Sequence, residues 1–67
     1  MKDFPLVFAF WDTLISMGKQ QGYDPYEVEM RLRMVPDNVF EHWVDDSISD
    51  DEIDLGKVQK YLDRLMR

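Results

Sequence analysis

The chain has 67 residues, which is enough for one domain spanning residues 1–67 but leaves little polypeptide for a deep pocket. It carries 14 acidic and 8 basic side chains, and the net charge of −6 disfavours direct binding to nucleic acids and to anionic membranes. It contains no cysteine, which excludes disulfides and thiol-based metal sites.

The first predicted helix covers residues 4–20. Asp3 is placed to cap its start, Pro5 fits its first turn, and Gly22 is expected to end it. Its beginning, residues 4–11, is apolar on nearly all sides. This run is much shorter than a membrane span and no signal-peptide cleavage site follows it, so we expect a cytoplasmic, unprocessed protein.

The segment after Asp24 is predicted to be the second helix, with Asp24 as its N-cap and Pro25 in its first turn. Two glutamates each precede an arginine by four residues, the spacing of helical ion pairs: Glu27 with Arg31, and Glu29 with Arg33. Apolar and charged residues also alternate here, as they do in a half-buried strand. The alternative is therefore an α+β fold with a two-stranded element at about 6–11 and 26–34.

Two further helices are expected in the second half of the chain. The third covers about 37–44, after Pro36. The fourth covers about 50–66 and would begin at a capping box, in which Ser49 accepts a backbone hydrogen bond and Glu52 bonds back. Apolar residues recur along it at three- and four-residue spacing: Leu55, Val58, Leu62 and Leu65. We therefore predict an all-α fold, a compact bundle of three or four short helices.

Residues 45–54 form an acidic run without a basic residue. The run holds six carboxylates: Asp45, Asp46, Asp50, Asp51, Glu52 and Asp54. Negative charges in the first turn of a helix interact favourably with its dipole, and other carboxylates could simply solvate a loop. The functional interpretation is a binding surface for a positively charged partner protein. The run does not match a calcium-binding EF-hand loop, because Asp50 stands at the glycine position and Gly56 at the final carboxylate position, so we predict no metal site.

Two other features could contribute to binding. Four cations recur along the last predicted helix: Lys57, Lys60, Arg64 and Arg67. They complement the dipole at its C-terminus, and they could also meet an acidic surface, including the acidic run of a second copy. On the first helix, Phe8, Phe10 and Trp11 are candidates for an apolar interface, since so small a bundle cannot cover every side of an apolar helix.

No catalytic motif is present. His42 is the only histidine, no Ser-His-Asp set is credible, and no glycine-rich phosphate loop occurs, so we predict no cofactor and no enzymatic activity. The prediction is a protein-interaction module that binds and modulates or inhibits a basic protein, such as a nucleic-acid-binding one. Its size and charge are typical of inhibitors and adaptors, including those of phages and mobile elements. The alternative is a structural or assembly protein that acts through homo-oligomerisation.

Overall fold

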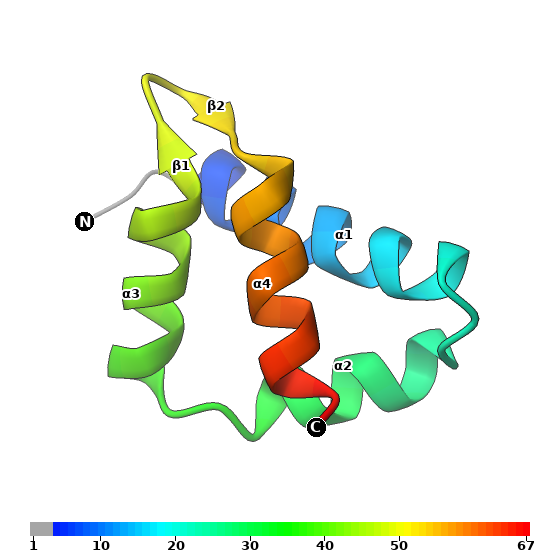
Figure 1. Cartoon of the computed structure of the whole chain (residues 1–67). Coiled ribbons are helices and arrows are strands. Elements are labelled where there is room, and N and C mark those ends of the chain that lie inside the picture. The colour runs from blue at the N-terminus through cyan, green and yellow to red at the C-terminus, as the bar shows by residue number, and fades with distance from the viewer. Residues whose placement is uncertain (1–3) are drawn as a thin grey trace.

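Four helices and one short hairpin make up the part of the chain that the structure, a computed structural model, describes, namely residues 4–67 (Figure 1). The helices are α1 (Phe4–Gln20), α2 (Pro25–Arg33), α3 (Asp37–Ser47) and α4 (Leu55–Leu65). Strands β1 (Ile48–Ser49) and β2 (Glu52–Ile53) connect α3 to α4. The prediction of a small helical bundle is confirmed, with a two-stranded antiparallel sheet added to it. No helix within residues 4–67 is long and apolar enough to cross a membrane.

Helix α1 covers the residues expected of it and ends as Gly22 indicated. Gly22 has φ +94°, and two backbone bonds close the turn: Gly22 N donates to Lys19 O at 3.1 Å and Tyr23 N to Gly18 O at 2.9 Å. This pair of bonds is the Schellman motif, which favours glycine because of the positive φ. Asp3, expected to cap the helix, lies outside the described residues.

Helix α2 begins at Pro25, and the side chain of Asp24 accepts a hydrogen bond from Tyr26 N at 3.0 Å, as predicted. Both expected ion pairs are present, Glu27 with Arg31 at 3.2 Å and Glu29 with Arg33 at 2.8 Å. A two-stranded sheet does exist, but it lies at residues 48–53, and the segments 6–11 and 26–33 are helical. Capping and the two ion pairs therefore decide α2 in favour of the helix.

The predicted start of the last helix is wrong. Ser49 and Glu52 do not form a capping box: they are Cα partners in the hairpin, next to the pair Ile48 and Ile53. Helix α4 begins five residues later than expected, at Leu55. Its N-cap is Asp54, whose Oδ1 accepts hydrogen bonds from Gly56 N at 2.9 Å and Lys57 N at 3.3 Å. Helix α3 also runs three residues past its expected end, to Ser47.

Helix α4 lies at the centre of the fold and contacts α1, α2 and α3 (Figure 1). Its inner face is fully buried at Val58, Tyr61 and Leu62. The ring of Tyr61 stacks on Trp43 of α3, with centroids 5.0 Å apart. Gly18 of α1 allows close packing here, because a Cβ at this position would lie 3.2 Å from Val28 and 3.4 Å from Leu62. With its inner face used for packing, α4 presents only its outer face to solvent.

Candidate functional site

The six carboxylates predicted to bind a partner divide into separate groups. Asp46 is half-buried on α3 and accepts a hydrogen bond from the hydroxyl of Tyr61 on α4, and the Nζ of Lys57 lies 3.7 Å from its Oδ2. The hydrogen bond from Tyr61 holds the pKa of Asp46 below its usual value, with help from Lys57 and against the effect of burial. Burial, followed by the bond to Asp46, raises the pKa of Tyr61 to about 12. Asp46 therefore joins α3 to α4.

Asp54 also has a role inside the fold. Its side chain caps α4, and its backbone N–H donates to Ser47 O at 2.7 Å, which ties the end of β2 to the end of α3. Both contacts use groups that a helix terminus would otherwise leave unpaired. Asp54 and Asp46 thus hold the base of the hairpin, and folding alone is enough to explain a carboxylate at each of these two positions.

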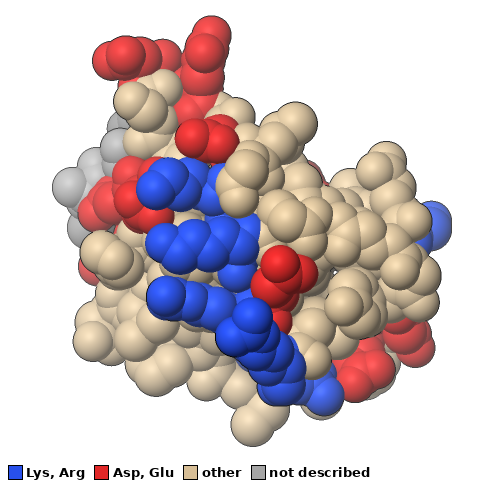
Figure 2. Space-filling model, in the orientation of Figure 1, with Lys and Arg blue, Asp and Glu red and all other residues tan. Residues whose placement is uncertain are grey.

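The remaining carboxylates of the hairpin are different. Asp50, Asp51 and Glu52, which we call the acidic tip, are exposed. Among the described residues, none of the three side chains has a hydrogen-bond or ion-pair partner. Asp50 and Asp51 have φ of +52° and +63°, as the two central residues of a type I′ turn require. Figure 2 shows acidic side chains projecting at the hairpin end of the molecule. Asp45 is exposed on α3, apart from the acidic tip.

A basic surface lies beside this acidic one. The outer face of α4 carries Lys57, Lys60 and Arg64, and Arg67 follows just after the helix; we call these four residues the basic ridge. Figure 2 shows the basic side chains running along α4. Lys60 Nζ and Arg64 Cζ lie 5.4 Å and 5.9 Å from the centroid of the Tyr61 ring, so that the ridge covers this buried ring. This surface therefore carries charges of both signs, negative at the acidic tip and positive along the basic ridge of α4.

The apolar interface predicted on α1 is corrected by the structure. Phe10 is fully buried and packs edge-on against Phe40, with centroids 5.6 Å apart, so it is a core residue. Trp11 is half-buried and also contacts Phe40, at 5.9 Å. Only Phe8 is largely exposed. Phe10 and Trp11 both contact Phe40 of α3, so α3 covers a side of α1 that the sequence of α1 alone leaves without a partner.

Sequence analysis missed a larger apolar surface on α2. Tyr26, Met30 and Met34 are 68%, 45% and 80% exposed. They follow one another at four-residue spacing, so they lie on one face of α2 and its C-cap. The sequence does carry this signal, because four-residue spacing is that of a helical face, but the alternation with charged residues in the same segment is equally typical of a strand.

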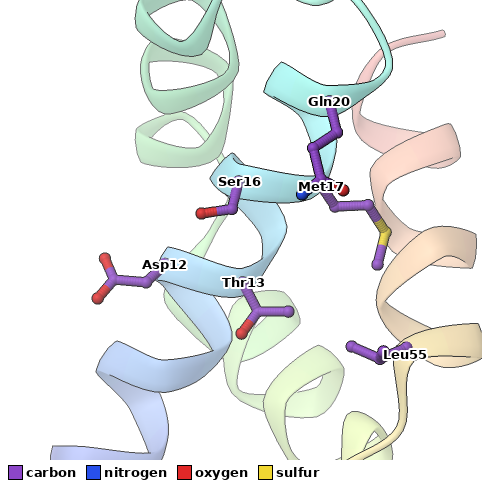
Figure 3. A pocket seen from close by; sticks show the side chains of 6 residues that line it. All are labelled: Asp12, Thr13, Ser16, Met17, Gln20 and Leu55. Atoms are coloured by element: carbon purple, nitrogen blue, oxygen red, sulfur yellow. The ribbon is translucent and has the colours of Figure 1, made fainter.

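A shallow hollow of about 330 Å³ lies between α1 and the start of α4. It is lined by Asp12, Thr13, Ser16, Met17, Gln20 and Leu55. Figure 3 shows Asp12 and Ser16 pointing away from Leu55, so their oxygens do not converge in the hollow. No histidine or cation stands among these six side chains to activate a nucleophile. Within residues 4–67, no group of three His, Asp or Glu side chains is arranged to hold a metal ion.

Comparison with known proteins returns no match: no family model, no curated protein and no solved structure matches this chain. Any functional proposal therefore depends on the surface itself.

Proposed function

We propose that this protein is a cytoplasmic, non-enzymatic interaction domain that binds a basic protein through its acidic tip and thereby modulates or inhibits that partner. The observation that carries the proposal is the contrast within one hairpin. Asp46 and Asp54 are bonded to the fold, whereas Asp50, Asp51 and Glu52 are exposed and have no partner among the described residues.

Turn geometry accounts for small residues such as Asp at positive φ in the acidic tip, but it does not require three adjacent negative charges. A type I′ turn favours Asn-Gly at its central positions, because glycine adopts positive φ without steric cost. Asp50 and Asp51 occupy these positions instead, and their adjacent negative charges repel each other. A cationic partner would be attracted to both charges and would offset their mutual repulsion, and the attraction would also accelerate encounter.

The basic ridge restricts the orientation in which a partner can dock. A cationic patch on the partner is attracted by the acidic tip and repelled by Lys60 and Arg64 on the outer face of α4. Opposite signs on neighbouring surfaces favour one docking geometry and disfavour others. We therefore expect the partner to contact the hairpin end and to extend away from α4. Nucleic-acid-binding proteins carry basic surfaces of the required kind, which makes them the favoured class of partner.

Neutralising the acidic tip tests this proposal without disturbing the fold. In the triple variant Asp50→Asn, Asp51→Gly, Glu52→Gln, the turn acquires its preferred residues while three charges are removed. We expect capture of basic proteins from lysate of the native host to fall at least about tenfold, with a loss that shrinks as salt is added. Binding is measured by quantitative mass spectrometry, followed by titration of the captured partner.

A matched control removes three carboxylates from elsewhere on the surface. Asp12→Asn, Asp37→Asn and Glu41→Gln change exposed residues outside the hairpin and alter the net charge by the same amount. This control should retain the captured proteins. Equal loss in the two triple variants would show that only net charge matters, and unchanged binding by the tip variant would refute the proposal.

A further inference from the structure

The outer face of α2 carries apolar side chains that the fold does not use. Val28 and Leu32 are buried and attach α2 to the core. Tyr26, Met30 and Met34, which we call the α2 stripe, lie on the opposite face and remain exposed. A contiguous exposed apolar strip with a charged border is the usual mark of a protein interface.

The charged border of the stripe is arranged in a regular way. The ion pair of Glu27 and Arg31 flanks one side, and that of Glu29 and Arg33 flanks the other. On each border the glutamate lies nearer the N-terminus of α2 than the arginine does. Each border is therefore negative at one end and positive at the other.

We propose that the α2 stripe binds the α2 stripe of a second copy of this chain, with the two helices antiparallel. A two-fold axis at Met30 brings each Met30 against its counterpart and each Tyr26 against the Met34 of the other copy. In this arrangement the acidic half of each helix faces the basic half of the other on both borders. A parallel arrangement would instead place acidic halves together, which is electrostatically unfavourable.

The contact is self-complementary, as a two-fold interface must be. Because it consists of one short helix from each copy, it buries less than the roughly 1,200 to 2,000 Å² of stable complexes, so we expect a reversible dimer. Helix α2 and the hairpin lie at opposite ends of the molecule in Figure 1, so the dimer leaves both acidic tips accessible. Self-association is thus independent of partner binding at the acidic tip.

The first test measures mass in solution. Sedimentation of the full chain from about 10 µM to about 1 mM should show the average mass rising from that of one chain towards that of two. Met30→Glu should shift the dissociation constant at least about tenfold, because it places two carboxylates against each other at the centre. Leu55→Glu is the matched control, since Leu55 is 60% exposed but lies on α4. A monomer throughout this range, or equal effects of the two variants, would overturn the proposal.

The second test determines the pairing, and it uses the absence of cysteine from the natural chain. Met30→Cys should form a disulfide-linked dimer under mild oxidation, because the two residues meet at the axis. Met34→Cys should not link to itself, since the two Met34 positions of the antiparallel pair lie about 12 Å apart along the helix axes. It should instead link to Tyr26→Cys when the two variants are mixed. Efficient self-linking of Met34→Cys would indicate parallel helices, and no preference over Leu55→Cys would exclude the α2 stripe as the interface.

Discussion

The base and the tip of the hairpin hold the same kind of side chain and use it differently. At the base, Asp46 accepts a hydrogen bond from Tyr61 and Asp54 caps α4. At the tip, Asp50 and Asp51 are exposed and their side chains contact no described partner. A run of carboxylates is therefore not one surface. Whether each charge is available for binding depends on the donor that the fold places beside it.

Among the predictions that separate the base of the hairpin from its tip, the largest change in the free energy of unfolding should occur at alkaline pH. The pKa of Tyr61 is raised from 10.0 to about 12, so the neutral hydroxyl stabilises the fold below pH 10.0 and this contribution is lost as the pH rises towards about 12. The difference between the two pKa values corresponds to about 3 kcal/mol. Urea unfolding at a series of pH values measures it. Tyr61→Phe lacks the titrating group, and a similar alkaline loss in that variant would contradict the assignment.

The effect of acidic pH on the same contact between Asp46 and Tyr61 should be smaller than that of alkaline pH. The pKa of Asp46 is lowered from 3.8, so its contribution is present above pH 3.8 and is lost as the pH falls below that value. Because the Asp46 side chain is 32% exposed, water screens this interaction. The titration of Asp46 by NMR should give a pKa that rises towards 3.8 in Tyr61→Phe, and an unchanged pKa would show that the hydroxyl is not its main partner.

At neutral pH, the largest loss of stability should follow from removing the hydrogen bond between Tyr61 and Asp46. At neutral pH, Tyr61→Phe should lower the free energy of unfolding by about 1.5 kcal/mol, because a bond to a charged acceptor is lost while the stack on Trp43 is kept. Chemical denaturation measures this change. Tyr23→Phe, at a residue that is 37% exposed, is the control and should alter stability little. Equal stabilities of the two variants would refute the role given to the hydroxyl.

Loss of the cap should cost somewhat less. Asp54→Ala leaves the N–H groups of Gly56 and Lys57 without their acceptor, and we expect about 1 kcal/mol of destabilisation. Asp54→Ser should retain most of the stability, since a serine hydroxyl also caps helices. If Asp54→Ala unfolded at the same denaturant concentration as the natural chain, the helix start at Leu55 would be in doubt.

The smallest effect should have the opposite sign. Replacing Asp50 with Asn and Asp51 with Gly should raise the free energy of unfolding by about 0.5 kcal/mol, because the turn then carries residues suited to positive φ and loses a charge repulsion. Thermal unfolding measures this gain. A clear loss of stability would mean that the tip carboxylates support the fold, and the contrast between base and tip would fail.

Much of the fold could be predicted because its signals are local. Asp24, Pro25 and Gly22 mark helix ends by their own chemistry, and the two Glu–Arg pairs of α2 lie within one helix. The hairpin was missed because Ser49 and Glu52 fit a capping box as well as a strand pair. Strands of two residues are too short to show alternation, and Asp54 is an equally good cap five residues further on.

The candidate site was less accessible to sequence reasoning. The acidic run itself was found, but its division depends on Tyr61, which reaches Asp46 from fifteen residues away in the chain. Likewise, Phe10 and Phe8 are two residues apart on α1, and only the packing of α3 makes the first a core residue. Local patterns report what a side chain can do, and tertiary contacts decide which side chains remain available.

The anchoring of the hairpin has a consequence for the thermodynamics of association. Ile48 is buried, Asp54 N donates to Ser47 O, and Asp46 is bonded across to α4, so both ends of the turn are fixed before any partner arrives. A loop that is already ordered loses little conformational entropy on binding, whereas a flexible acidic tail would have to be ordered at that moment. The three charges of the acidic tip, held on an anchored hairpin, can thus bind more tightly than the same three charges on a disordered segment.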